Sequence, residues 1–201
     1  MRKRSSYDYD PDAPLSPEEV QQEAERFTQR VGARIAELRE ARGYSQARVC
    51  REHDFNQSQI SRIEAGKMNL TLRTACRVAA FLDVRPWELY VPREQSELAL
   101  EAREDLPPKP TGKDLAEAAL RFREQFGARV RELRTLQGMS LESLETFSGV
   151  MRKTLADIER GAYNVRTTTV VRLADAIGVY PYELLIPREQ SGIRLKPPGR
   201  S

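Results

Sequence analysis

The chain has 201 residues, of which 39% are hydrophobic and 31% charged, enough apolar side chains for a folded core. No stretch approaches the roughly 18 apolar residues of a membrane-spanning helix, and two cysteines make no disulfide framework, so membrane, secreted and fibrous classes are excluded. The net charge is only +3, but it is unevenly spread: residues 26–92 carry about +5 and residues 121–187 about +2.

The first half of the chain reads as a series of helices. Ser16 and Glu19 have the spacing of a capping box, and apolar residues then recur at helical intervals until Gly43, which predicts a long amphipathic first helix with a possible break near Gly32. Shorter helices follow: 45–53, 57–65 ending at Gly66, 72–82, and a turn after Pro86. Strand-type alternation is absent from the sequence.

The second half repeats the first at a constant offset of 95 residues. The segment 31–96 aligns with 126–191 without a gap, with roughly 24 identical positions; GARIAELR meets GARVRELR, and VPREQS meets IPREQS. The same helices are therefore expected from residue 111 onward, including short helices at 140–147, 152–160 and 167–177. The chain consists of two copies of one helical module.

Composition shifts suggest where the two modules begin and end. We expect a disordered head at 1–15, a first domain at 16–95, a linker at 96–110, a second domain at 111–190 and a disordered basic tail at 191–201. Three prolines between residues 107 and 110 make the second half of the linker a stiff, extended spacer. The predicted architecture is all-α, with two tandem five-helix domains that each have an extended first helix.

Two short helices joined by a tight turn form a helix-turn-helix unit. The segment SQARVCREHDFNQSQISRIEAGKMNLTLRTACRVAAFLDVRPWEL, residues 45–89, resembles the helix-turn-helix domain of the Cro, lambda-repressor and Xre family. The second copy, residues 140–184, matches that pattern more loosely. The resemblance implies two lambda-repressor-like domains and binding to double-stranded DNA.

In such a unit the second helix enters the major groove and its first residues reach base edges. Ile60 and Ile63 share the inner face of helix 57–65, while the polar side chains Gln57, Ser58, Gln59 and Ser61 are left for bases. Asn56 with Gln59 also has the spacing of a capping pair. The resemblance implies that Gln46 contacts phosphate and braces this helix, and that Arg62, Lys67 and Asn69 hold backbone phosphates.

The second copy departs from the family pattern at Leu141, Glu145 and Asp157, which replace Gln46, Cys50 and Arg62. Its recognition helix nevertheless starts with Arg152, Lys153 and Thr154, and Tyr163 and Asn164 follow the helix end. Two interpretations remain open. The module reads a different half-site, with Arg152 or Lys153 on guanine, or it serves dimerisation or partner binding.

No catalytic constellation is visible: the sequence has no Gly-rich phosphate loop and a single histidine, so we expect neither an enzyme nor a cofactor or metal site. The leading hypothesis is a sequence-specific transcriptional regulator of a bacterium or its phage. It would be a repressor that blocks an operator, located in the cytoplasm and associated with the nucleoid. The partners would be operator DNA and, as further possibilities, a second copy of the chain or another protein. The alternatives are a DNA-binding antitoxin or restriction-modification controller, and a helical adaptor whose second module does not bind DNA.

Overall fold

The computed structural model describes residues 15–91 and 112–186. Most of the predicted head, and the predicted linker and tail, lie outside these residues, so the disorder expected for the head and tail and the stiff spacer expected in the linker stay predictions. Leu15, the last residue assigned to the head, is described, and its side chain packs against the hydrophobic core.

The first module opens with the long helix α1 (Pro17–Ala41). Its start is the predicted capping box: the Glu19 amide donates to Ser16 Oγ over 3.3 Å, and the Ser16 amide donates to Glu19 Oε2 over 2.8 Å. These bonds favour the ionised carboxylate and lower the pKa of Glu19. The helix runs through Gly32 without the break that the sequence allowed.

The helix-turn-helix unit of this module consists of α2 (Gln46–His53) and α3 (Gln57–Glu64). Asp54, in the left-handed conformation, ends α2, and Gly66, with a φ of +65°, follows the end of α3. Helix α4 (Leu72–Phe81) and the short 3-10 helix η1 (Pro86–Leu89) complete the module.

The second module repeats this order with α5 (Gly112–Leu136), α6 (Leu141–Ser148), α7 (Arg152–Glu159), α8 (Thr167–Ile177) and η3 (Pro181–Leu184). Within residues 15–91 and 112–186 every regular element is a helix, apart from one isolated bridge between Thr71 and Arg166. The predicted all-α fold with two tandem modules is therefore confirmed.

Gly32 and Gly127 lie where each long helix crosses the third helix of its module. A Cβ at Gly32 would lie 2.4 Å from the Ile63 carbonyl oxygen, and one at Gly127 would lie 2.1 Å from the Ile158 carbonyl oxygen. No side chain fits between backbones at this distance. The two glycines let α1 approach α3, and α5 approach α7, at backbone contact.

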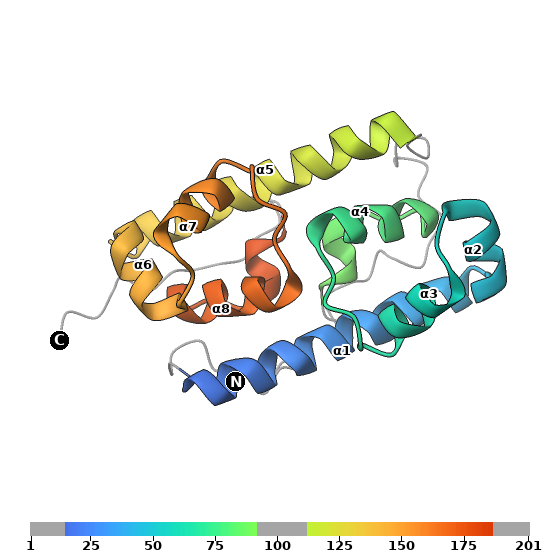
Figure 1. The fold of residues 1–201 in the computed structure, drawn as a ribbon, viewed down its shortest axis with the longest axis horizontal. Helices are drawn as coiled ribbons and strands as arrows, with labels where there is room; N and C mark the ends of the chain where they lie inside the picture. The colour runs from blue at the N-terminus through green and yellow to red at the C-terminus, as the bar shows by residue number, and fades with distance from the viewer. Residues whose placement is uncertain (1–14, 92–111, 187–201) are drawn as a thin grey trace, which may run out of the picture.

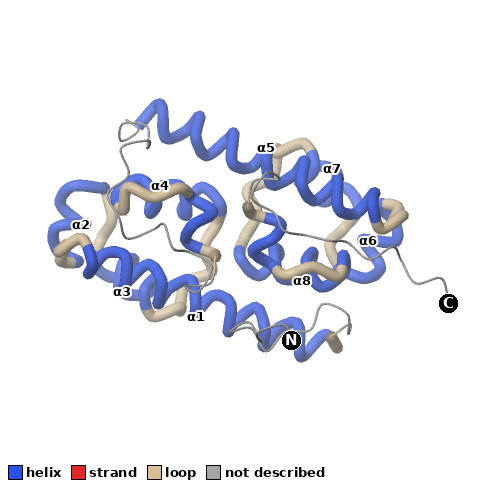
Figure 2. The backbone as a smooth tube through the Cα atoms, turned by 180° about the vertical axis from the view of Figure 1, so that it is seen from behind, coloured by secondary structure: helices blue, strands red, loops and turns tan. Residues whose placement is uncertain are grey.

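The long first helices do more than complete their own modules. Helix α1 packs on α8 of the second module, and α5 packs on α4 of the first. Figures 1 and 2 show the result from both sides: α4 and α8 lie between the long helices α1 and α5. The buried apolar residues of both modules join in one continuous cluster, so the described residues share a single core.

The two modules are related by an approximate two-fold axis. The paired residues Thr71 and Arg166 are equivalent positions of the repeat, and they pair antiparallel. The bonds around them are reciprocal: the Leu72 amide donates to the Val165 carbonyl over 2.9 Å, and the Thr167 amide to the Leu70 carbonyl over 2.8 Å. Figure 1 looks along this axis, with α3 and α7 at corresponding places on either side of the centre.

Candidate nucleic-acid interface

Helix α3 has the two faces that the sequence predicted. Ile60 and Ile63 are buried in the core, at 0% and 1% exposure. Gln57, Ser58, Ser61 and Arg62 are exposed, whereas Gln59 is half-buried. The helix therefore presents short polar and amide side chains outward from a rigid apolar base.

Asn56 and Gln59 form the predicted capping pair. The Gln59 amide donates to Asn56 Oδ1 over 2.8 Å, and the Asn56 amide donates to Gln59 Oε1 over 3.1 Å. The cap occupies one side-chain oxygen of each residue. Gln57, Ser58, Ser61 and Arg62 are exposed on α3 and take no part in this cap.

Helix α3 is anchored to α1 by a buried ion pair. Arg39 Nε donates to Glu64 Oε1 over 2.6 Å, and its Nη2 donates to Oε2 over 2.9 Å, a bidentate contact. The same guanidinium donates to the Tyr44 carbonyl, and Gln46 Nε2 donates to Glu64 Oε2 over 2.9 Å. Bonding to Glu64 raises the pKa of Arg39. Gln46 thus braces α3, as the family resemblance implied, while its contact with phosphate stays a prediction.

The second module keeps the ion pair without the brace. Arg134 donates to both oxygens of Glu159 over 2.6 and 3.1 Å, and to the Met139 carbonyl. Leu141 occupies the place of Gln46 and has no donor to offer. Glu159 therefore relies on Arg134 more than Glu64 relies on Arg39.

Helix α7 differs from α3 in both its cap and its charge. Its N-cap residue, Met151, provides no side-chain hydrogen bond, and the Arg152 amide instead donates to Glu145 Oε1 over 2.9 Å. Arg152 and Lys153 are exposed and Thr154 is half-buried. Asp157, the acid that replaces Arg62, is paired with Arg160. The start of α7 is therefore cationic, and its acid is balanced by a neighbouring cation.

The residues expected after each recognition helix separate into two groups. Lys67 and Tyr163 are exposed, with 43% of Tyr163 accessible. Asn69 and Asn164 are half-buried beside the two-fold axis, and their DNA contacts stay a prediction. The Thr168 amide donates to Asn69 Oδ1 and the Arg73 amide to Asn164 Oδ1, each over 3.2 Å. The structure therefore places these two asparagines between the modules.

Three residues near the candidate interface were missed by the sequence reasoning. Glu145 appeared only as a departure from the family pattern, although its carboxylate caps α7. Arg73 and Arg166 are exposed beside the two-fold axis. Their repeat equivalents are Thr168 and Thr71, so the internal comparison of the two copies did not single them out.

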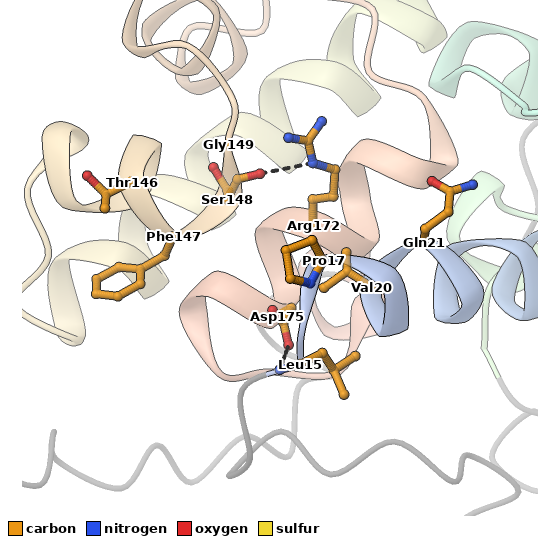
Figure 3. Close-up of a pocket in the computed structure, with 10 residues that line it drawn as sticks. All are labelled: Leu15, Pro17, Val20, Gln21, Thr146, Phe147, Ser148, Gly149, Arg172 and Asp175. Atoms are coloured by element: carbon orange, nitrogen blue, oxygen red, sulfur yellow. Dashed lines mark hydrogen bonds between the residues drawn. The ribbon is translucent and has the colours of Figure 1, made fainter.

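A pocket of about 350 Å³ lies where the start of α1 meets the second module (Figure 3). The Leu15 amide donates to Asp175 Oδ1 over 3.3 Å, and Arg172 Nε donates to the Ser148 carbonyl over 2.9 Å. Phe147, at the end of α6, points away from these groups in Figure 3 and is 68% exposed. The pocket is therefore lined both by the start of α1 and by α6 and α8 of the second module.

Residues 15–91 and 112–186 hold no group of three or more His, Cys, Asp or Glu side chains in an arrangement that could bind a metal ion. No helix there is both long and apolar enough to cross a membrane.

Comparison with known families and proteins agrees with this geometry. Residues 35–89 match a family model described as helix-turn-helix, and residues 125–185 match a second one described as a helix-turn-helix domain. The molecule is thus a tandem helix-turn-helix protein.

Two curated relatives extend this comparison. An uncharacterised HTH-type transcriptional regulator of Sinorhizobium fredii is 33% identical over 70 residues, 35% of this chain and 91% of the relative. The control protein C.BamHI of Bacillus amyloliquefaciens is 38% identical over 61 residues, 30% of this chain and 75% of the relative. No solved structure matches the chain significantly. The chain belongs to the Xre family of helix-turn-helix transcriptional regulators.

Proposed function

We propose that this regulator binds double-stranded DNA sequence-specifically, with α3 and α7 each in the major groove of one half-site. The observation that carries the proposal is the pair of outward-facing polar helices, each held on an apolar base. The two-fold axis points toward the viewer in Figure 1, and a rotation about it does not change the position of a helix along the axis. Helices α3 and α7 therefore lie at the same height along this axis. Two helices at one level suit a single duplex.

The two helices support different base contacts. Helix α3 offers Gln57 and two serine hydroxyls, and a glutamine amide pairs bidentately with adenine. Helix α7 offers Arg152 and Lys153, whose charged groups suit the O6 and N7 acceptors of guanine. The two half-sites of the operator would therefore differ in sequence.

Phosphate contacts would come from exposed cations around these helices. Arg62 and Lys67 flank the end of α3, and Arg73 and Arg166 lie exposed beside the two-fold axis. Such contacts orient the protein without reading sequence.

The proposed mode of regulation is repression, because a chain that covers an operator excludes polymerase without further chemistry.

A second candidate function concerns the second module alone. Phe147 and Met151 are 68% and 69% exposed next to the start of α7, where the first module has the polar residues Glu52 and Asn56. An exposed apolar pair at this place favours a protein partner for α6 and α7. The C.BamHI relative is named a control protein, which supports the controller alternative for this chain.

Selection of bound sequences from random duplex DNA tests the proposal. The intact chain should select a site with two unlike halves. The double variant Gln57→Ala with Ser61→Ala, which spares the α3 cap, should lose one half, and Arg152→Ala with Lys153→Ala the other. Arg121→Ala, which removes an exposed cation from α5, should leave the selected site unchanged.

Different outcomes separate the candidate functions. A site with one half, insensitive to the α7 variant, would assign the second module to a protein partner. Absence of binding even at low salt, where phosphate contacts are strongest, would refute DNA recognition altogether.

A further inference from the structure

The contacts at the centre of the molecule are those of a symmetric dimer formed within one chain. Thr71 pairs with its own repeat equivalent, Arg166. The two backbone hydrogen bonds beside them are equivalent, because each joins the same two positions of the repeat in the opposite direction. The asparagine bonds are reciprocal too, since Asn69 and Thr168 are the repeat equivalents of Asn164 and Arg73. In a two-fold interface, the same surface of each half contacts the other in this way.

We propose that one chain covers one operator whose unlike half-sites are inverted and lie at a single fixed spacing, and that Asn69 and Asn164 are positioning residues for that spacing. This inference rests on the proposed DNA binding. It goes further because it assigns the arrangement of the half-sites, the number of chains per site and a role for two side chains.

The inverted arrangement follows from the direction of the symmetry axis. A two-fold rotation that superposes α3 on α7 reverses the direction in which the second module meets the duplex. Two modules joined only by a linker could also settle on direct repeats. Here the packing of α1 on α8 and of α5 on α4 holds the modules in the inverted orientation.

The fixed spacing follows from the number of independent contacts between the modules. The described residues connect them through two helix pairs, a shared apolar core and the bonds around Thr71 and Arg166. Sliding one module along the duplex would break all of these together. The distance between α3 and α7 is therefore set by this interface, whatever the length of the segment between residues 91 and 112.

The two asparagines tie the loops that follow the recognition helices. The side chain of Asn69 makes two bonds to Thr168, because its Nδ2 also donates to Thr168 Oγ1 over 2.8 Å. Asn164 accepts from the Arg73 amide, and Arg73 has no hydroxyl to complete the second bond. Loss of Asn69 should therefore weaken the contact between the two modules more than loss of Asn164.

The experiment measures the affinity of the full chain for duplexes that carry the two selected half-sites. One series keeps the halves inverted and inserts or removes base pairs between them, and another places them as direct repeats. Each added base pair moves one half-site by about 3.4 Å and rotates it by about a tenth of a helical turn. Native mass spectrometry of the complexes counts the chains on each duplex.

We expect one chain per duplex, one optimal inverted spacing and a loss of affinity on the order of tenfold or more when the spacing changes by two base pairs. Direct repeats should bind no better than a single half-site. Equal affinity across spacings or orientations, or two chains on the optimal site, would overturn the inference while the proposed function stood. Absence of binding to every duplex would overturn both.

Variants at the axis test the positioning role. Asn69→Ala and Thr168→Val should both flatten the dependence on spacing, and Thr168→Val should leave affinity for an isolated half-site unchanged. Lys67→Ala, the matched loss of a phosphate contact, should weaken binding about equally at every spacing and reduce the salt slope by about one.

The same experiment separates positioning from phosphate binding. If Asn69→Ala weakens binding uniformly, as Lys67→Ala should, Asn69 contacts phosphate and the positioning role is wrong. Far-ultraviolet circular dichroism of each variant checks that the chain is folded. Thr168→Val removes a single hydroxyl and nearly preserves side-chain volume, so it keeps the test valid should Asn69→Ala unfold.

Discussion

Replacing Arg39 with methionine should sharply reduce the stability of the chain and disturb the position of α3. The guanidinium and the Glu64 carboxylate are 9% and 8% exposed, so the substitution leaves a negative charge buried without its cation. Removing one partner of a buried ion pair typically costs about 3–5 kcal/mol. Gln46 still donates to Glu64, so the lower end of that range, about 3 kcal/mol, is expected.

The second module offers an internal comparison. Arg134→Met leaves Glu159 without the amide that Gln46 provides in the first module, because Leu141 stands in its place. A hydrogen bond to a charged group contributes about 1.5–3 kcal/mol. The expected loss for Arg134→Met is therefore about 4–5 kcal/mol, larger than that for Arg39→Met.

Urea unfolding followed by circular dichroism measures both losses. With an m-value of about 1–3 kcal/mol/M, a loss of about 3 kcal/mol lowers the midpoint by at least about 1 M. Arg48→Met, which breaks the half-exposed pair with Glu52, is the control and should cost under about 1 kcal/mol. The double variant Arg39→Met with Glu64→Met should recover most of the loss, because it buries no charge.

Two results would refute this reasoning. One is a loss for Arg39→Met no larger than that for the exposed Arg48 control. The other is a double variant as unstable as the single one, which would show that the packing of the arginine stem, rather than the orphaned carboxylate, determines the cost.

Further predictions concern the close approach, the thiols and the second cap. Gly32→Ala should destabilise the chain by about 1–3 kcal/mol in urea unfolding, because the added Cβ would lie 2.4 Å from the Ile63 carbonyl oxygen. This cost should exceed the gain from the better helix propensity of alanine. An unchanged stability would show that α1 and α3 can move apart at little energetic cost. Burial raises the pKa of Cys76 to about 12, so at pH 8 a thiol reagent should label the half-buried Cys50 much faster, and equal rates would contradict the burial. Cys76 ionises more readily in the unfolded chain, where its pKa is about 8.5, so its contribution to stability should be complete below about pH 8.5 and decline as the pH rises toward 12. Urea unfolding at a series of pH values measures this decline. If the urea midpoint of the wild type increased relative to that of Cys76→Ala above pH 9, the predicted sign would be wrong. Glu145→Ala removes the cap of α7, should cost about 1 kcal/mol, and should weaken binding only to the half-site read by α7; equal loss at both half-sites would argue against a local role.

Much of each module could be predicted from local signals. The capping box at Ser16, the left-handed Gly66 and the repeat offset all report on interactions within a few residues or on the repeat itself. The same applies to α3, whose inner isoleucines and outer polar residues follow from helical periodicity. These features depend on backbone geometry, which neighbouring residues determine.

The roles of Asn69, Asn164 and Glu145 could not be predicted in this way. Each makes its contact with a residue on another element: the asparagines bond across the two-fold axis, and Glu145 reaches from α6 to the first amide of α7. A side chain that accepts a hydrogen bond from a distant amide has the same sequence signature as one that faces solvent or phosphate. Periodicity cannot distinguish these cases.

Helical periodicity, caps and repetition are local properties of the chain, so the order of residues alone predicts a tandem repeat of one helical module, with unlike outer faces on α3 and α7. How the two copies combine depends instead on contacts between residues far apart in the chain. The apolar stripes of the long first helices extend beyond what their own modules cover, and burying that surface requires the other module. The packing of each long helix on the other module, and the reciprocal bonds around Thr71 and Arg166, place α3 and α7 about one axis.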